Sequence, residues 1–525
     1  MSAHDPLDEV ERPMHEVVII GAGLGGIGVA IKLSEAGIDD FVLLERASDI
    51  GGTWRDNTYP GIASDVPAQV YQYSFDLNPD WSHVFAPGQE IMAYIRRLAD
   101  KYEVMERVCL DSEVRSRTWD EGSHLWRLDT PRGEVTARYV ISAIGAFVDR
   151  KPVDLAGVDR FAGETMHTSA WNHDIDLRGK RVALVGTGAS AVQIVPEIAD
   201  EVSHLDVYQR TPIWVAPKPD LPTPRPVRRL FRTFPVVQDL VRRASTRAAE
   251  GVFVGVALRY GRRLSISDVV GSGLRRVWYR LQVPDPELRK ALTPDYGFGC
   301  KRPSVSNRYL RTFMRDHVDL VTKPIQEVTP EGVRTGDGVV RSADVLVLAT
   351  GFRMATDPEI YERTPVRGRG GFDLATFYRE ERLKSYEGVS LPGLPNHFIV
   401  FGPYGWIGGT WHQLVEIASA HAIRVIMAAR SLGATSVEVR DEACDRWTES
   451  MRDQFEGSLF LSGQCATSNS YYFDKRGDVP YLRPTSSAEA VEATASFPLD
   501  DYRFTALGER PALDAQVDVP VGRVD

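Results

Sequence analysis

Short apolar runs that end in glycine-rich turns, each followed by a stretch with helical spacing, occur twice in this chain. Val17 to Ile20 leads into a turn that begins at Gly21, and the apolar positions from Ile27 to Ala36 then recur with helical spacing. Arg181 to Val185 leads into a second such turn, and Val192 to Ala199 is again helical in spacing. Buried parallel strands joined to helices produce this pattern. The chain is therefore predicted to have an α/β fold.

Further apolar runs predict the elements that complete two sheets. Alternating apolar and polar positions between Val114 and Tyr139, with turns at 120–123 and 131–133, favour antiparallel strands. Longer stretches with helical spacing predict helices at 84–108 and 414–429. Short segments rich in apolar residues predict strands at 41–44, 139–143, 205–208, 318–321, 344–349 and 398–401.

The first glycine turn has the spacing of a dinucleotide-binding fingerprint. Gly21 permits a tight turn, Gly23 lets the backbone approach a pyrophosphate, and Gly26 allows close packing of the helix on the strand. Glu45 ends the next strand and places a carboxylate where ribose hydroxyls can donate to it. Because an acidic residue repels a 2′-phosphate, this site suits FAD or NAD and not NADP.

The second turn repeats the fingerprint with a final alanine, reading Gly186-Thr187-Gly188-Ala189-Ser190-Ala191. Arg210 follows this turn at the same spacing at which Glu45 follows the first one, and Thr211 comes next. A cation at that position suits a 2′-phosphate, so the second dinucleotide is predicted to be NADP(H). The alternative is that Arg210 is a solvated charge at the end of a strand.

A loop rich in glycine and aromatic residues runs from Gly51 to Asp65, soon after the Glu45 strand. It contains Gly52, Thr53, Trp54 and Asp56, followed by a Pro-Gly turn. We expect it to wrap the flat isoalloxazine ring of a flavin; otherwise its aromatic residues belong to the core. The aromatic residues that follow at Tyr71, Tyr73 and Phe75 form either core or a substrate wall.

Residues 216–295 differ from the rest of the chain because they combine several prolines with arginine-rich amphipathic stretches. Val227 to Arg247 and Leu274 to Leu281 are such stretches. They predict a helical insertion inside the second nucleotide domain, with the arginines forming a solvated face.

The composition limits the function classes. The chain has 525 residues, 43% of them hydrophobic and 26% charged, which predicts two or three folded domains. Its net charge of -10 supplies no basic excess to neutralise phosphates, so no nucleic-acid partner is expected. The sequence has no run of 18 apolar residues and no apolar leader, so we expect a cytoplasmic protein without an integral membrane segment.

The four cysteines are far apart and form no CxxC pair. Their spacing argues against a disulfide framework, a zinc site and a dithiol redox centre, and thus against a disulfide reductase. We therefore expect no metal. The cysteines are Cys109, Cys300, Cys444 and Cys465.

Between the two glycine turns lies the segment Phe161-Ala-Gly163-Glu-Thr-Met-His167-Thr-Ser-Ala-Trp171, which matches the pattern FxGxxxHxxxW. With the Gly51 to Asp65 loop, this segment makes the chain resemble the type I Baeyer-Villiger monooxygenases, class B flavoproteins, over roughly residues 15–480. The resemblance implies two Rossmann-like domains that bind FAD and NADPH. It also implies that the linker segment couples these domains.

The resemblance also implies a reaction. An oxygen atom from O2, carried as a flavin C4a-peroxide, is inserted next to the carbonyl of a ketone or aldehyde to give an ester or lactone. Arg302 matches the family's catalytic cation and Asp65 its carboxylate partner, while Lys301 joins Arg210 and Thr211 around the 2′-phosphate. The remaining cofactor-binding candidates are Tyr71, Val114, Gln193 and the turn and loop residues named above, and the substrate-binding candidates are Trp406, Tyr471 and Tyr472.

Two departures from the family pattern stand out. Asn172 follows Trp171 where the family usually has proline or aspartate, and Tyr471-Tyr472 replaces a common Trp-Tyr pair. A sulfide- or amine-oxygenating enzyme is an alternative, because the same peroxyflavin supports that reaction when protonated. An uncoupled NADPH oxidase or redox-sensing flavoprotein is another, which the Tyr471 replacement favours and the Asp65, Lys301 and Arg302 set disfavours. A monomer and a homodimer are equally compatible with the sequence.

These assignments divide the chain into six parts. They are the first part of the FAD-binding domain (1–150), the linker and first part of the NADPH-binding domain (151–215), the helical insertion (216–295), the second part of the NADPH-binding domain (296–350), the second part of the FAD-binding domain (351–506) and a loosely ordered tail (507–525).

Overall fold

The computed structural model describes residues 14–251 and 265–508. Its larger sheet is built around β1 (Met14–Ile20), which pairs in parallel with β2 (Phe41–Leu44) and β6 (Gly133–Ser142). β3 (Val108–Cys109) lies beyond β2, while β5 (Leu125–Thr130), β4 (Ser116–Asp120) and β19 (Val366–Arg367) lie beyond β6, which also pairs with β20 (His397–Ile399).

Helix packing on this sheet follows from its apolar strands. The last four residues of β1 and all of β2 are buried. Two helices, α1 (Leu24–Glu35) and α12 (Trp411–Ser431), pack against each other and share one apolar core with these strands and α3 (Gly88–Lys101). The glycine-rich turn and the start of α1 are thus held on a rigid layer.

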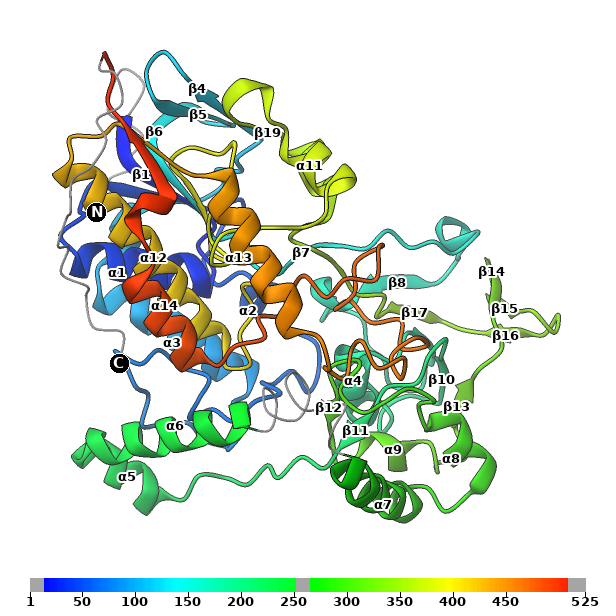
Figure 1. Cartoon of the computed structure of the whole chain (residues 1–525). Helices are drawn as coiled ribbons and strands as arrows, with labels where there is room; N and C mark the ends of the chain where they lie inside the picture. The colour runs from blue at the N-terminus through cyan, green and yellow to red at the C-terminus, as the bar shows by residue number, and fades with distance from the viewer. Residues whose placement is uncertain (1–13, 252–264, 509–525) are drawn as a thin grey trace, which may run out of the picture.

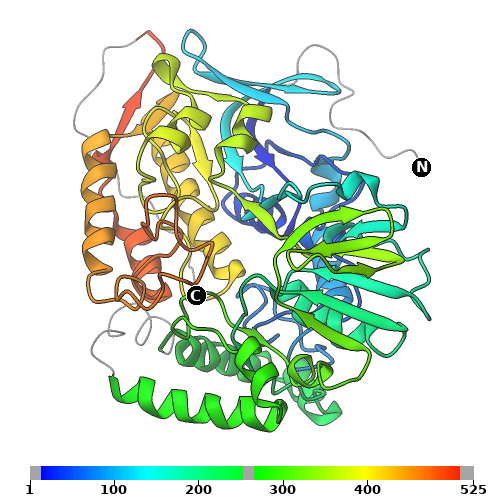
Figure 2. The ribbon, with the colours of Figure 1, turned by 90° about the vertical axis from the view of Figure 1, so that its right-hand side faces the viewer.

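The smaller sheet contains five strands, all parallel, in the order β13, β10, β9, β17 and β8. Helix α4 covers one face, and a three-stranded antiparallel sheet covers the other (Figure 2). The bounds are β8 (Glu164–His167), β9 (Arg181–Val185), α4 (Ala189–Ile198), β10 (His204–Tyr208), β13 (Val318–Val321), β17 (Val345–Leu348), and β14 (Ile325–Thr329), β15 (Gly332–Thr335) and β16 (Val340–Ser342) in the covering sheet.

The larger sheet with its helices forms the first lobe, and the smaller sheet with its coverings forms the second. The chain passes from the first lobe to the second and back. β7 (Phe147–Arg150) leaves the first lobe, and β18 (Phe352–Met354) returns to it, paired antiparallel with β7. The predicted α/β fold with two Rossmann-like units is therefore confirmed. The residue boundaries of the domains stay predictions.

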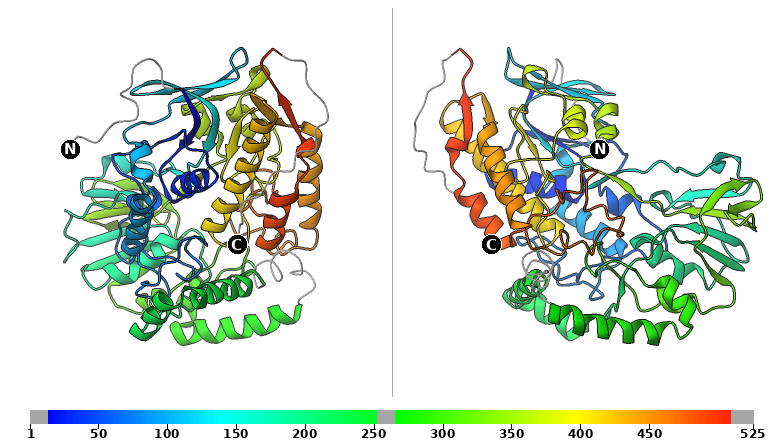
Figure 3. Two further views of the ribbon diagram at one scale, coloured as in Figure 1. Left: turned by 90° about the vertical axis from the view of Figure 1, so that its left-hand side faces the viewer. Right: turned by 45° about the vertical axis from the view of Figure 1, so that its right-hand side comes forward.

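The arginine-rich insertion is helical, as predicted. α5 (Arg225–Thr233), α6 (Pro235–Glu250) and α7 (Ser265–Gln282) lie along one side of the molecule, at the bottom of each view in Figures 1 and 3. α7 packs on the smaller sheet's lobe, whereas α6 packs on residues of the first lobe: Gln238 Nε2 donates to the Asn78 carbonyl over 2.7 Å. The insertion thus contacts both lobes.

Several predicted bounds are wrong in detail. The strand predicted at 139–143 is the end of β6, which pairs with β5 on one side and β1 on the other. The helix predicted at 84–108 divides into α3 and a 3-10 turn, η1 (Val104–Arg107), because Glu103 adopts a left-handed conformation with φ of 56°. The predicted loose tail lies outside the described residues after 508.

The remaining elements are short or lie at the edges of the lobes. They are α2 (Thr53–Asp56), α8 (Pro286–Leu292), α9 (Tyr309–Thr312), α10 (Pro358–Arg363), α11 (Leu374–Glu380), α13 (Asp441–Gln454), α14 (Ser487–Ser496), β11 (Val215–Ala216), β12 (Ser304–Val305), β21 (Ser436–Val439), β22 (Tyr502–Thr505), and the 3-10 turns η2 (Val158–Arg160), η3 (Thr168–Ala170), η5 (Arg369–Gly371) and η6 (Leu499–Asp501). Among the described helices, none is long and apolar enough to cross a membrane.

Candidate active site

The first glycine turn leaves the N-terminus of α1 open. Gly21 has φ of 100°, and a Cβ there would lie 2.9 Å from the Ala143 carbonyl oxygen. A Cβ on Gly26 would lie 1.8 Å from the Gly21 carbonyl oxygen, so only glycine fits. Gly23 caps the helix without a side-chain hydrogen bond, which leaves the first-turn N–H groups free to bind a pyrophosphate.

Glu45 lies beside this turn at the end of β2 and is 5% exposed. Its Oε2 accepts from the Ala22 N–H over 2.8 Å, and its Oε1 accepts from Ala47 N–H over 3.0 Å and from Arg55 over 3.2 Å. A carboxylate offers about four acceptor positions, so these bonds orient Glu45 and leave capacity for a ribose hydroxyl.

The glycine-aromatic loop lies against the first turn, as Gly51 N–H donates to the Ala22 carbonyl over 3.0 Å. Trp54 Nε1 donates to Tyr71 Oη over 3.1 Å, which joins the loop to the aromatic residues after it. Tyr73 belongs to the core, because it is fully buried. Asp56 is paired with Arg55 over 2.7 Å, and its predicted cofactor contact stays a prediction. Val114 is buried in the core behind the larger sheet.

The second turn repeats this geometry at α4. Gly186 has φ of 117°, and a Cβ there would lie 2.4 Å from the Ala349 carbonyl oxygen. Gly188 caps α4 without a side-chain hydrogen bond, and a Cβ there would meet open space. Thr187 Oγ1 donates to the Thr211 carbonyl over 3.0 Å and ties the turn to the end of β10, while Ala189 and Ser190 form the first turn of the helix.

Three cations, Lys151, Arg210 and Lys301, lie close enough to one another to interact. Burial lowers the pKa of Lys301, and the neighbouring charges of Arg210 and Lys151 lower it further. Cations that repel one another are stabilised by a shared anion, which fits a 2′-phosphate. Sequence reasoning missed Lys151, since a lysine in a linker carries no signal of what it faces.

Arg302 and Asp65 form a two-pronged ion pair. Arg302 Nε donates to Asp65 Oδ2 over 2.8 Å, and Nη2 donates to Oδ1 over 2.7 Å. The charge of Asp65 is the main cause that raises the pKa of Arg302. The two side chains are 34% and 31% exposed, so the guanidinium is oriented without being enclosed.

The predicted substrate-binding residues gather around this pair. The Arg302 guanidinium lies 5.9 Å from the ring centre of Trp406, which stacks on Tyr471 at 6.4 Å. Burial raises the pKa of Tyr471 and of Tyr472, so both phenols stay protonated near neutral pH. Residues from four separate parts of the chain, at 65, 302, 406 and 471–472, thus lie together at this pair.

The linker segment packs against the glycine-aromatic loop and shares an apolar cluster with helix α4. Trp171 packs in one apolar cluster with Tyr59 of the glycine-aromatic loop. Tyr59 Oη donates to Gln193 Oε1 over 3.1 Å, and Gln193 Nε2 donates to the Ala63 carbonyl over 2.9 Å, which joins α4 to that loop. Sequence reasoning assigned Gln193 to cofactor binding and missed its contacts with this loop.

The other linker residues make packing and hydrogen-bond contacts within the protein. Burial and the charge of Arg150 lower the pKa of His167 to about 4, so its imidazole is neutral near pH 7. A Cβ on Gly163 would lie 2.4 Å from the Asp344 carbonyl oxygen, and Phe161 packs on the covering sheet's core. Asn172 accepts from the Asp174 N–H over 3.0 Å, so asparagine closes the turn after Trp171.

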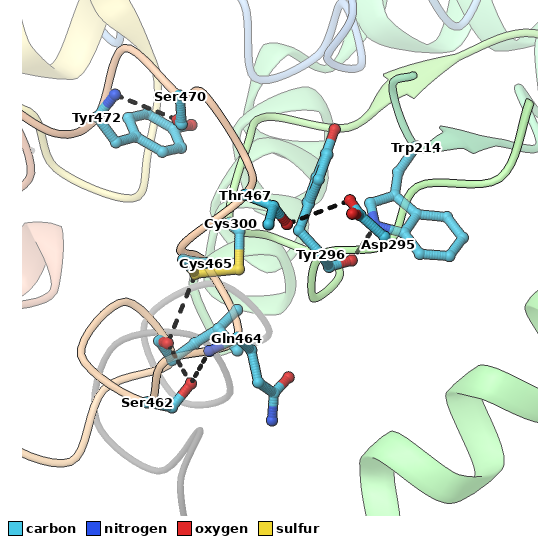
Figure 4. Close-up of a disulfide and its surroundings, with 11 residues drawn as sticks. Trp214, Asp295, Tyr296, Cys300, Ser462, Gln464, Cys465, Thr467, Ser470 and Tyr472 are labelled. Atoms are coloured by element: carbon cyan, nitrogen blue, oxygen red, sulfur yellow. Dashed lines mark hydrogen bonds between the residues drawn. A yellow bond between two sulfur atoms is a disulfide. The ribbon is translucent and has the colours of Figure 1, made fainter. Parts of the chain in front are cut away.

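A disulfide joins Cys300 to Cys465, across 165 residues (Figure 4). The argument from cysteine spacing against a disulfide framework is therefore wrong for this pair, since spacing along the chain says nothing about two loops that meet in space. Around the bond, Gly297 N–H donates to the Gln464 carbonyl over 3.1 Å, and Thr467 Oγ1 donates to Asp295 over 3.1 Å. The bond holds the loop of Lys301 and Arg302 against the segment that leads to Tyr471.

Known proteins resemble this chain over most of its length. A Baeyer-Villiger monooxygenase of Pseudomonas aeruginosa is 37% identical over 86% of this chain and 84% of its own. A Baeyer-Villiger monooxygenase of Streptomyces coelicolor is 35% identical over 100% of this chain and 98% of its own. This chain belongs to the Baeyer-Villiger monooxygenases. Residues 18–226 also match the family described as pyridine nucleotide-disulphide oxidoreductase.

Solved structures agree with this Baeyer-Villiger monooxygenase assignment. The cyclohexanone monooxygenase from Rhodococcus sp. Phi1 bound to NADP+ has a TM-score of 0.83 at 27% identity and covers 94% of this chain and 100% of its own. The OTEMO complex with FAD and NADP has a TM-score of 0.81 at 28% identity, with the same coverage. The predicted family and enzyme class are confirmed.

Proposed function

We propose that this Baeyer-Villiger monooxygenase uses FAD, NADPH and O2 to convert a ketone into an ester or lactone at the Arg302–Asp65 pair. The observation that carries the proposal is the bidentate ion pair beside Trp406 and Tyr471. When bound, FAD reduced by NADPH supplies an activated oxygen atom derived from O2.

Arg302 supplies the fixed positive charge that the reaction needs. As oxygen adds to a carbonyl, negative charge develops on the substrate oxygen, and a preorganised donor stabilises it. Asp65 fixes the guanidinium with two hydrogen bonds, and roughly a third of the arginine side chain remains exposed to meet that charge. Asp65 therefore acts as a positioning residue, and Arg302 as the group that contacts the reacting oxygen.

The cofactor sites are assigned from the same geometry. The open N-terminus of α1 and the Glu45 carboxylate would hold the pyrophosphate and ribose of FAD, and Gly52, Thr53 and Trp54 would border the flavin. The open N-terminus of α4 would hold the NADPH pyrophosphate, and Arg210, Lys301 and Thr211 would bind the 2′-phosphate.

The aromatic residues around Arg302 favour a substrate with an apolar body. Trp406, Tyr471 and Tyr472 pack against one another beside the Arg302 guanidinium. Such an aromatic surface would bind the hydrocarbon part of a ketone. We propose aldehydes as a second class of substrate for the same site. The oligomeric state and the cytoplasmic location stay predictions.

Product analysis tests this proposal. The FAD-loaded enzyme is incubated with NADPH, O2 and, separately, a cyclic ketone, an aryl alkyl sulfide and a tertiary amine, and the products are identified by gas chromatography. We expect esters or lactones from the ketones. Sulfoxides or amine oxides without any ester, or hydrogen peroxide alone, would overturn it.

A further inference from the structure

Helix α6 presents its apolar side to solvent. Val236 is 72% exposed and Leu240 is 60% exposed, whereas the opposite side, formed by Gln238, Arg242, Thr246 and Glu250, is buried. A helix on the surface of a globular protein normally turns its apolar side to the core and its polar side to water. The reverse arrangement in α6 indicates that its outward side contacts another molecule or surface.

The buried polar side of α6 attaches the helix to the molecule. Gln238 Nε2 donates to Gln69 Oε1 over 3.0 Å as well as to the Asn78 carbonyl, and Glu250 Oε1 accepts from the Ser487 N–H over 3.1 Å. These bonds fix the orientation of α6, so its outward apolar side is a stable feature of the fold.

Helix α7 repeats the arrangement. Leu274, Val277 and Leu281 are 69%, 54% and 67% exposed, and their spacing places them on one side of the helix. Tyr279 and Gln282, on the other side, are each 3% exposed. Nine of the 18 exposed large hydrophobic residues of the described chain lie between 221 and 281. These nine, the basic apolar face, are Leu221, Leu230, Phe234, Val236, Leu240, Val241, Leu274, Val277 and Leu281.

Many arginines lie in the same segments as the basic apolar face. Residues 221–250 and 272–282 contain ten arginines against two acidic residues, in a chain whose net charge is -10. Arg228 and Arg229 precede Leu230, and Arg243 and Arg247 flank the outward side of α6. Apolar side chains bordered by arginines match the interface of an anionic bilayer, where the rings and alkyl groups enter and the cations meet headgroups.

We propose that the basic apolar face docks this monooxygenase peripherally on an anionic lipid surface. The helices that carry the face lie along one side of the molecule (Figure 3). A second copy fits this face less well, because a symmetric contact would bring arginines against arginines. Charge complementarity therefore favours lipid.

The test is flotation of the FAD-loaded, full-length enzyme with vesicles of phosphatidylcholine alone and of phosphatidylcholine mixed with phosphatidylglycerol. We expect binding to the anionic vesicles that weakens with added salt. Val236→Ser/Leu240→Ser should reduce vesicle partitioning at least about tenfold by removing buried apolar area. Arg228→Gln/Arg229→Gln should reduce it on the order of tenfold by removing charge near the lipid.

A matched control replaces exposed apolar residues elsewhere, Val339→Ser/Leu432→Ser, which are 46% and 39% exposed in the native protein. This control should bind vesicles as the native enzyme does, and all variants should keep native ketone turnover in solution. The proposal would be overturned if the native enzyme did not bind vesicles, or bound both types equally. It would also be overturned if the control lost as much vesicle binding as the variants of the face, or if sedimentation velocity showed a self-association that Val236→Ser/Leu240→Ser abolishes.

Discussion

Arg302 and Asp65 are 237 positions apart in the chain, yet they form the most specific polar contact of the site. Both come from loops held by rigid elements, Asp65 after α2 and Arg302 just before β12. Sequence reasoning could find this pair only through the resemblance to the family, because neither residue type nor spacing predicts that the two loops meet.

Replacing Arg302 by alanine should lower the rate of ester formation by about 10²–10³, since a single preorganised donor to a developing oxyanion is commonly worth that much. The amount of bound FAD should not change. Arg315→Ala, which removes a surface partner of Asp200, is the control and should keep native turnover. Undiminished ester formation by Arg302→Ala would remove the guanidinium from the mechanism.

Replacing Lys301 by alanine should weaken binding of NADPH about tenfold or more, because a hydrogen bond to a charged group is worth about 1.5–3 kcal/mol. Binding of NADH, which lacks the 2′-phosphate, should change little. Calorimetric titration with 2′,5′-ADP checks this without turnover. Equal losses for NADPH and NADH would show that Lys301 supports the loop and does not contact the phosphate.

At the scale of elements, local patterns predicted most of the fold. The strands that lead into Gly21 and Gly186 were predictable because apolar runs and glycine turns are local signals. The Cys300–Cys465 bond and the outward apolar side of α6 were not, since both depend on which distant segments meet. An amphipathic stretch predicts a helix, but it does not tell which side faces the protein.

The disulfide should stabilise the loop that carries Lys301 and Arg302. Cys465→Ser should lower the free energy of unfolding by about 2–5 kcal/mol. It should also raise the KM for NADPH, because the loop is no longer tied to the segment before Tyr471. Thermal unfolding and steady-state kinetics measure both effects, and the native enzyme treated with dithiothreitol should behave like the variant. Cys109 and Cys444 carry thiols in either case. Alkylation of Cys300 and Cys465 as well in the untreated native protein, seen by mass spectrometry after denaturation, would contradict the bond.

For the whole molecule, the two lobes depend on each other. The linker, the Tyr59–Gln193–Ala63 hydrogen bonds and the disulfide all join parts of the chain that are far apart in sequence. With FAD on one lobe and NADPH on the other, as we propose, the two cofactors would have to meet across the lobes, and such connections limit how far the lobes separate.

Stability of the whole enzyme should fall on acidification. Burial lowers the pKa of His167 to about 4 and that of His412 and His421 to about 3, so these imidazoles are neutral when folded and take up protons on unfolding below their ordinary pKa of about 6.5. Their contribution is complete above about pH 6.5 and is lost as pH falls toward the folded values, with a slope of up to about 4 kcal/mol per pH unit.

Urea unfolding at about pH 7 and about pH 5 measures this dependence. His412→Leu should reduce the slope, because it removes one buried imidazole, whereas His173→Leu, at an exposed position, should not. A free energy of unfolding that is the same at both pH values would mean that the three histidines are not buried as neutral groups.

We propose that this monooxygenase transfers one oxygen atom of O2 to a ketone at the Arg302–Asp65 pair. The most direct measurement is turnover of a cyclic ketone under isotope-labelled O2, with the product examined by mass spectrometry and NADPH consumption followed in parallel. We predict a lactone that carries a single labelled ring oxygen and forms in equal amount to the NADPH consumed. Unlabelled lactone, or hydrogen peroxide as the sole oxygen product, would contradict the claim.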